Sequence, residues 1–296
     1  MGNKENNVPS GGQVANELVE QLRHKFLDSL ARDGQDYDPR DVEIIRTDDY
    51  SIRRFLTSNN MNASQAYSQL QETMRWRKEF PVQRDYSQCG VEVFRTGAMF
   101  IFENDREGRP VLYARVRTHV KIQELERLVE EVIVTTFEKL DQIAGEKGFT
   151  VVMDVSGAGL SNVDMRAVKF MITVMRKYYP ESLKCVLVVN LPIFLRTFMP
   201  IVRILLGSKY SEMLHTVSDA QDLFNYIHPD NVPKYLGGNN CHDFTQPPAE
   251  CHYKTEELSH LYGLSPTVVR KAIQKFEPHI NDAKKLLFKS IDLNAN

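Results

Sequence analysis

The chain has 296 residues, of which 42% are hydrophobic and 26% are charged. This composition is typical of a soluble globular protein and excludes the collagenous, coiled-coil and wholly disordered classes. The 37 basic and 39 acidic side chains give a formal net charge of −2, so no global field attracts the protein to nucleic acid, which we do not expect as a partner.

No stretch of the chain is predicted to span a membrane or to direct secretion. The longest apolar run, residues 185–195, is far shorter than the ~20 residues of a membrane-spanning helix. The polar N-terminus contains no apolar signal segment, and the four scattered cysteines fit a reducing compartment. We therefore expect a cytoplasmic protein.

The first third of the chain is predicted to be helical after a short tail. Residues 1–12 are rich in Asn, Gly and Ser and are expected to be disordered. Helical spacing of apolar residues begins at Val14, and further helices are predicted over 39–56 and 63–80. Residues 13–88 are therefore expected to form an N-terminal helical segment.

The spacing of the apolar residues then changes from helical to strand-like, which predicts an α/β domain over residues 89–240. The turn 104–108 joins two strands of a hairpin, 99–102 and 110–116. Two continuous apolar strands follow, 149–155 and 183–189, and such strands are typical of parallel pairing with both faces buried. The sequence predicts an N-terminal helical bundle followed by a mixed, largely parallel sheet flanked by helices. The flanking helices are expected at 122–143, 163–179 and 219–227.

Residues 192–206, called the lid segment below, are almost entirely apolar. Arg196 and Arg203 are the only charged residues in it, and in a helix these two residues, seven apart, lie on one stripe. Such a segment is either a buried core helix or a lid that covers an apolar cavity and can turn its apolar face to a membrane.

Residues 241–296 are predicted to form a linker and an amphipathic helical tail. Ser265 and Pro266 form a typical helix start, and apolar residues follow at helical spacing up to a break at Pro278. This tail could lie on a membrane, pack on its own domain or offer a surface to a protein partner.

Signals of metal, nucleotide or catalytic chemistry are weak. The loop 157–162 is one residue short of the dinucleotide-binding fingerprint, because Asn162 stands in place of its third glycine. The Cys-His pairs at 241–242 and 251–252 match no standard zinc spacing. His119 has no carboxylate or nucleophile near it in a recognisable arrangement. We therefore expect no cofactor, no metal site, no catalytic residue and no enzymatic activity.

Seven short motifs occur in the order and spacing of CRAL-TRIO lipid-binding proteins, and together they resemble that family over roughly residues 40–240. Three further stretches, 38–43, 163–165 and the Tyr-Tyr-Pro region, are most similar to the CRAL-TRIO part of the motile sperm domain-containing proteins. The seven motifs are DDYSIRRFL (48–56), MRWRKEF (74–80), DREGRPVL (105–112), MDVSG (153–157), YYPE (178–181), NLP (190–192) and PKYLGG (233–238).

The resemblance implies a lipid-binding bowl with a mobile apolar lid helix. It implies non-enzymatic binding of a phospholipid or other hydrophobic ligand, with transient membrane docking through the lid. Transfer or sensing of that ligand are the two roles that such binding would serve. A peripheral location at intracellular membranes, such as the endoplasmic reticulum or lipid droplets, and a role at organelle contacts would follow. The alternative is an adaptor with a vestigial pocket that acts through its C-terminal helices.

The resemblance also suggests which residues form the site. Where phosphatidylinositol-handling members carry cations, this chain has Asn59, Asn60 and Ser182, so weak or absent phosphatidylinositol binding is expected, with Glu181 as the remaining head-group candidate. Cavity candidates are Met153, Phe170, Met171, Val174, Met175, Val189, Phe194, Phe198, Met199 and Val202. Membrane-docking candidates are Arg196, Phe198, Ile201, Val202, Arg203, Leu205 and Leu206.

Overall fold

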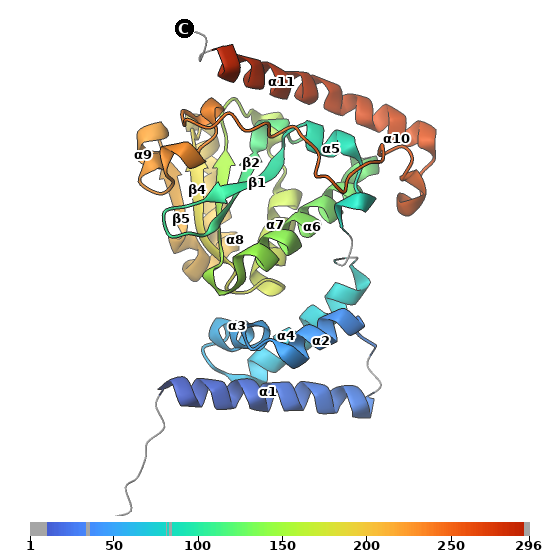
Figure 1. Cartoon of the computed structure of the whole chain (residues 1–296), viewed down its shortest axis with the longest axis vertical. Coiled ribbons are helices and arrows are strands. Elements are labelled where there is room, and N and C mark those ends of the chain that lie inside the picture. Colours follow the sequence, from blue (N-terminus) through green and yellow to red (C-terminus); the bar gives the residue numbers. More distant parts are fainter. Residues whose placement is uncertain (1–10, 34–35, 81, 83–84, 293–296) are drawn as a thin grey trace, which may run out of the picture. The chain divides into compact units, whose positions relative to one another are not determined.

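The computed structural model describes residues 11–33, 36–80, 82 and 85–292. The chain divides into two compact units, which are treated separately: a smaller one up to residue 81 that includes 176–181, and a larger one formed by 82–175 and the residues from 182 on (Figure 1). The predicted disordered tail, 1–12, lies outside the described residues except for its last two, which begin helix α1 (Gly11–Asp33). The domain boundaries expected from the sequence stay predictions.

The smaller unit is a helical bundle around one apolar core. Its other helices are α2 (Pro39–Thr47), α3 (Tyr50–Ser58) and α4 (Ala63–Glu79). The single helix predicted over 39–56 is wrong, because the backbone of Asp48 is extended and ends α2, while its carboxylate accepts a hydrogen bond from the Ser51 amide (2.8 Å) and thereby starts α3. The core contains Val19, Leu22, Phe26, Ile45, Ile52, Phe55, Leu56, Ala66, Leu70 and Met74.

The contacts that hold the segment 176–181 in the smaller unit include one from a charged side chain and one between aromatic rings. The guanidinium of Arg54 donates from Nε to the Pro180 carbonyl oxygen (2.8 Å). The rings of Trp76 and Tyr178 stack with their centroids 4.0 Å apart. Both contacts come from motifs that carry the family resemblance, so these motifs have a packing role here.

The larger unit is built on a five-stranded mixed sheet, which confirms the predicted fold class. The strand order is β1-β2-β3-β4-β5; β1 and β2 pair antiparallel as the predicted hairpin, and the other pairs are parallel. The fifth strand was not predicted, because four residues that include His215 and Thr216 give no clear apolar pattern. The strands are β1 (Met99–Asn104), β2 (Pro110–Arg115), β3 (Phe149–Asp154), β4 (Leu183–Val189) and β5 (Leu214–Val217).

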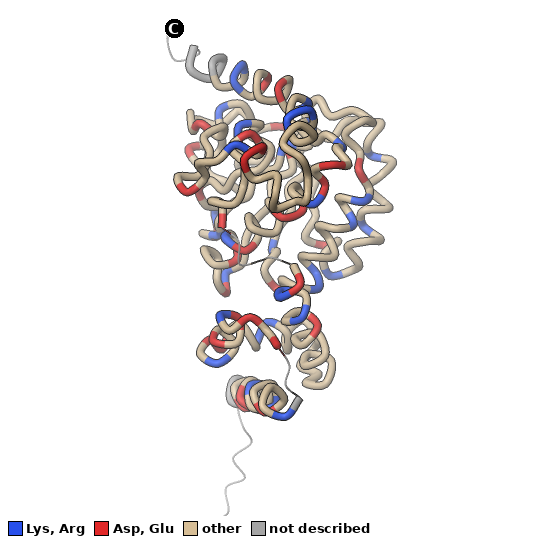
Figure 2. Tube along the Cα trace, turned by 90° about the vertical axis from the view of Figure 1, so that its right-hand side faces the viewer, with Lys and Arg blue, Asp and Glu red and all other residues tan. Residues whose placement is uncertain are grey.

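Helices lie on both faces of this sheet and across one of its ends (Figure 1). None of the helices in the described ranges combines the length and the hydropathy needed to cross a bilayer. Basic and acidic residues are interspersed along the trace of each unit (Figure 2). The helices of the larger unit are α5 (Val91–Arg95), α6 (Glu126–Ala144), α7 (Met165–Lys177), α8 (Met199–Glu212), α9 (Ala220–Phe224), α10 (Pro266–Ile273) and α11 (Glu277–Asp292).

The two faces of the sheet are covered differently. Because side chains alternate along a strand, Val152 and Leu187 belong to a closed core on one face, together with residues 223–236. Their neighbours Val151, Val186 and Val188 point to the other face, toward the side of α7 and the lid segment. The continuous apolar strands therefore serve two surfaces, as predicted for a sheet that is buried on both faces.

The C-terminal helices pack on the larger unit. Their apolar stripe is buried at Val269, Ala272 and Phe276, where it contacts the stretch before α6. One carboxylate of α11, Asp282, is bound by the Nη2 atoms of Arg115 (3.2 Å) and Arg117 (3.0 Å).

The side chain of Arg115 has no exposed surface. Its second nitrogen, Nη1, donates to the Thr96 carbonyl oxygen, and its guanidinium lies 5.1–5.5 Å from the ring centres of Phe244 and Tyr235. Of the placements that the sequence left open for the tail, packing on its own domain is the one observed.

Candidate functional site

The larger unit contains an apolar cavity of about 220 Å³ between the sheet and the lid segment. Its floor is formed by alternate side chains of β3 and β4, such as Val151, Met153 and Val188. Its sides are formed by α7 residues that include Met171 and Met175. Unbranched methionine side chains adapt to ligands of different shape, so this wall suits flexible hydrophobic molecules.

The lid segment covers this cavity with one of its faces. It begins as a 3-10 helix, Ile193–Phe198, and continues into α8. Five of its side chains, at the spacing of one helical face, line the cavity. The five are Leu195, Phe198, Met199, Val202 and Leu206.

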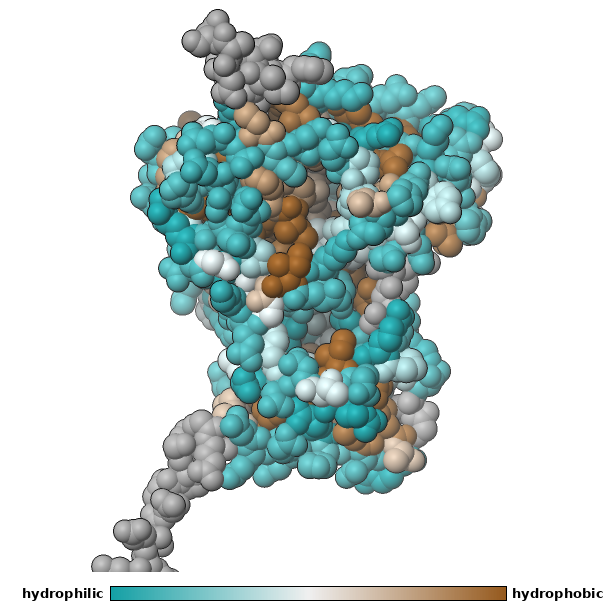
Figure 3. Space-filling view, viewed as in Figure 1, coloured by the Kyte–Doolittle hydropathy of each residue, from teal (hydrophilic) through white to brown (hydrophobic). Residues whose placement is uncertain are grey.

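The opposite face of the lid segment is also apolar but faces solvent. Ile193 and Ile204 are 80% and 78% exposed, and Phe194 and Ile201 are about half exposed. Large exposed apolar side chains that are clustered in this way mark a contact surface more often than scattered ones do. An apolar band also interrupts the mostly hydrophilic face of the larger unit in Figure 3.

The lid segment ends at a break in α8. Gly207 has φ 74° and ψ 170°, which is not helical and is a conformation that residues with a Cβ rarely adopt. The helix direction therefore changes directly after Leu206, the last lid residue that lines the cavity.

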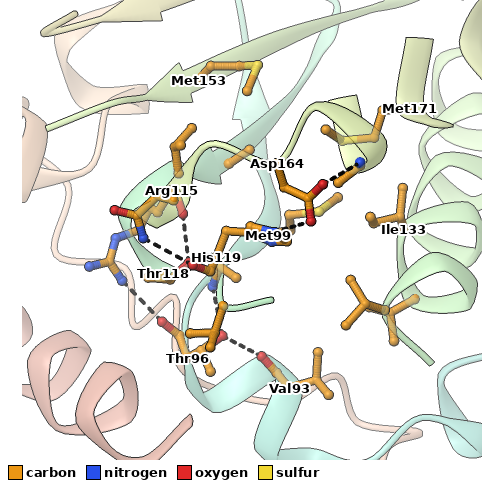
Figure 4. Close-up of a pocket in the computed structure, with 18 of the residues that line it drawn as sticks. Val93, Thr96, Met99, Arg115, Thr118, His119, Ile133, Met153, Asp164 and Met171 are labelled. Carbon is orange, nitrogen blue, oxygen red and sulfur yellow. Dashed lines mark hydrogen bonds and ion pairs between the residues drawn. The ribbon is translucent and has the colours of Figure 1, made fainter. Parts of the chain in front are cut away.

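A second cavity of about 170 Å³ adjoins the first and shares Met153, Val168 and Met171 with it. Apolar side chains such as Met99 and Ile133 form most of its wall (Figure 4). Phe276 contributes to the wall from the C-terminal segment. Together the two cavities lie in the range of ~300–1,000 Å³ that is common for small-molecule sites.

One end of the second cavity is polar and contains a histidine–carboxylate pair. His119 Nε2 lies 3.2 Å from Asp164 Oδ2 (Figure 4). The other carboxylate oxygen, Oδ1, accepts hydrogen bonds from the Arg166 and Ala167 amides and so caps α7. Burial favours a higher pKa for Asp164, but the hydrogen bonds from the Ala167 amide and His119 hold its pKa below the usual value.

Sequence reasoning missed this pair because the two residues are 45 positions apart. The expectation that His119 has no carboxylate near it is therefore wrong. The one available signal was Asp164 itself, an acceptor placed just before a predicted helix, which is a typical N-cap.

The structure places the predicted cavity residues in different surroundings. Those on the walls of the first cavity are Met153, Met171, Met175, Phe198, Met199 and Val202. Val189 instead packs in the core on the other face, since it shares the strand parity of Cys185 and Leu187. Phe194 is half exposed, Val174 is buried outside both cavity walls, and Phe170 lines a polar surface pocket.

The other predicted residues are distributed as follows. Of the docking candidates, Phe198, Val202 and Leu206 face the cavity, while Arg196, Ile201 and Arg203 are exposed and Leu205 is partly buried. Glu181 has a positive φ of 66°, belongs to the smaller unit and is not among the residues that line the two cavities. Within the described part of the chain, no three His, Cys, Asp or Glu side chains form a group that could hold a metal ion.

Comparison with known proteins supports the resemblance. A CRAL-TRIO domain-containing protein of Schizosaccharomyces pombe is 27% identical over 272 residues, which cover 85% of this chain and 61% of the relative. A phosphatidylinositol transfer protein of Eremothecium gossypii is 24% identical over 257 residues, which cover 81% of this chain and 57% of the relative. The chain thus spans less than two thirds of the length of these relatives.

A solved structure and a family model agree with these relatives. The crystal structure of Sfh5 matches with a TM-score of 0.65 at 17% identity, covering 90% of this chain and all of that chain, which supports the fold. The family model of the CRAL/TRIO domain matches residues 94–238, which include all five strands and the lid segment. Residues 94–238 of the chain therefore match the CRAL-TRIO family.

Proposed function

We propose that this protein binds one hydrophobic ligand, a phospholipid or another lipid, in the joined cavities and transfers or senses it without enzymatic chemistry. The observation that carries this proposal is the nearly unbroken apolar lining beneath the lid segment. The relatives named as lipid transfer proteins support it.

The energetics of lipid transfer fit such a cavity. Each methylene hidden from water contributes ~0.8 kcal/mol, so a chain of about 16 carbons needs a partner that compensates on the order of 12 kcal/mol when it leaves a bilayer. The apolar walls and the lid face provide that surface. A carrier of this kind needs only to open and close.

The lid segment would exchange the ligand at a membrane surface. Its outer side chains Ile193 and Ile204 would enter the apolar boundary of the bilayer. The exposed Arg196 would meet anionic head groups, as would Arg203 once released from its hydrogen bonds to Ser211 and to the Leu214 carbonyl oxygen. Gly207 marks the point at which the segment could turn away from the cavity.

Phosphatidylinositol is not the ligand that we propose. In the larger unit, Ser182 is fully buried and hydrogen-bonded to Asp141, so it offers nothing to a phosphate. In the smaller unit, the Asn59 amide is bound to the Phe55 carbonyl oxygen and to Gln69. Retention of phosphatidylinositol in a liposome-transfer assay would contradict this part of the proposal.

The two faces of the lid segment allow a matched test of the proposal. The double variant Ile193→Asp/Ile204→Asp changes only exposed side chains and is expected to lose co-sedimentation with liposomes while it keeps a bound lipid in native mass spectrometry. Val202→Asp, which places a carboxylate on the cavity side, is expected to lose the lipid. Circular dichroism checks that both variants fold. Unchanged liposome binding by the double variant would overturn the docking role.

The ligand itself is tested on protein purified from eukaryotic cells. A lipid at one molecule per chain is the expected result of extraction and mass spectrometry. A protein without ligand would overturn the carrier proposal in favour of the adaptor with a vestigial pocket. The narrower likeness to motile sperm domain-containing proteins, and with it a location at the endoplasmic reticulum or lipid droplets, is likewise a proposal, which cell fractionation tests.

A further inference from the structure

The polar side chains at one end of the second cavity restrict which polar groups a bound ligand can have. Thr118 donates from Oγ1 to the Arg115 carbonyl oxygen (2.7 Å). Asn162 uses Oδ1 to accept from the Gly159 amide and Nδ2 to donate to the carbonyl oxygens of Arg117 and His119. The hydroxyl and amide protons of these two side chains are therefore already engaged within the protein.

Within the described ranges, one cation lines the cavities, and it is already ion-paired. Among the described residues of both walls, the only lysine or arginine is Arg115, whose Nη1 and Nη2 bind Thr96 and Asp282, while its buried Nε has no hydrogen-bond partner. Asp164 adds a carboxylate to the same end. A phosphate or carboxylate would thus meet the carboxylate of Asp164, and the one cation on the wall, Arg115, is already paired with Asp282.

His119 is the group left to meet a ligand. The ionised carboxylate of Asp164 can only accept a hydrogen bond, so the neutral imidazole of His119 carries its proton on Nε2 and has an acceptor at Nδ1. Within the described ranges, no hydrogen bond to Nδ1 is formed. A ligand with one hydrogen-bond donor, such as an alcohol, would satisfy this acceptor in the otherwise apolar cavity.

The position of the pair fits a polar ligand end. His119 and Asp164 line the second cavity and also a partly polar pocket of about 290 Å³ that includes the charged residues Lys121, Glu130 and Arg166. The pair therefore lies where apolar walls give way to charged groups. The lid segment does not contribute to this pocket.

We propose that the ligand is a hydrophobic molecule that ends in a single hydroxyl group, and that this hydroxyl donates to Nδ1 of His119. This inference rests on the proposed function and names its ligand class. The apolar body would extend from His119 along Met153 and Met171 toward the lid segment, because both methionines line both cavities.

The test compares three probes that share one carbon chain: oleyl alcohol, cis-9-octadecene and oleic acid. Their affinities for the full chain are measured by displacement of Nile red. Wild-type protein is expected to bind the alcohol at least about tenfold more tightly than the alkene. His119→Leu should bind both equally, whereas the control His215→Leu, on β5 and outside both cavity walls, should keep the preference.

A second variant addresses the discrimination against acids. Asp164→Asn keeps an oxygen to cap α7 but removes the negative charge, so oleic acid should gain affinity relative to the alcohol. Equal binding of alcohol and alkene by wild-type protein, a preference that survives in His119→Leu, or tighter binding of oleic acid by wild-type protein would each overturn the inference. If none of the three probes displaces Nile red, the proposed lipid binding itself fails.

Discussion

The two faces of the central sheet differ although the same strands build them. Val151 and Val152 are neighbours on β3, yet Val151 faces the cavity and Val152 lies in a closed core. On the face that carries Val152, the residues that follow β5 add large side chains such as Leu223 and Ile227 to the closed core. On the face that carries Val151, the cavity separates the sheet from α7 and the lid segment. Whether a sheet face is packed or hollow is therefore decided by what covers it.

The largest expected difference between the two faces is in how much the free energy of unfolding falls when a side chain is truncated. Leu187→Ala removes a fully buried side chain from the closed core and should lower the free energy of unfolding by about 2–5 kcal/mol. Met153→Ala enlarges a cavity that is already there and should cost less than half as much. Urea unfolding of both variants measures the difference, and equal losses would show that the two faces are packed alike.

Adding volume sharpens the comparison with a matched pair on adjacent residues. Val152→Phe overfills the core and should cost about 1–3 kcal/mol, whereas Val151→Phe should be tolerated. The same Val151→Phe change should weaken ligand binding because it occupies cavity volume. Thermal melting and Nile red binding are the two measurements. Destabilisation by Val151→Phe as large as that by Val152→Phe would contradict the hollow face.

The smallest expected effect is a pH dependence confined to the closed face. His242 stacks on Phe102 (4.3 Å between ring centroids), which packs against the core, and burial lowers the pKa of His242 below 6.5. His242 therefore binds a proton more readily in the unfolded chain than in the folded protein. Its contribution to stability is fully present above about pH 6.5 and is lost as the pH falls through that value. Between pH 7.5 and 5.5, the melting temperature of His242→Phe should fall less than that of the wild-type protein. Equal losses would exclude this histidine as a contributor.

Much of the fold could be predicted from the sequence because its signals are local. Continuous apolar strands predicted parallel pairing, and the hairpin residues predicted β1 and β2. The break at Asp48 was missed because the helical period continues through it, and only the local hydrogen bonds distinguish two helices from one. β5 was missed because its pattern is too short.

The candidate site was predictable only in part. The apolar lid segment was recognisable, and six of the proposed cavity residues lie on the wall of the first cavity. The inclusion of Val189 shows the limit, because a strand that is apolar at every position carries no signal of which parity faces the hollow side. The pairing of His119 with Asp164 depends on tertiary structure, which no spacing along the chain reveals.

The buried guanidinium of Arg115 also has a consequence for the biosynthesis of the protein. Its hydrogen-bonded carboxylate, Asp282, lies 167 residues further along the chain. At ~5–20 residues per second, a ribosome needs roughly 8–33 s to translate that interval. A charge that is buried without its partner costs several kcal/mol. The contacts around Arg115, at the end of β2, are therefore completed late, after almost the whole chain has been made.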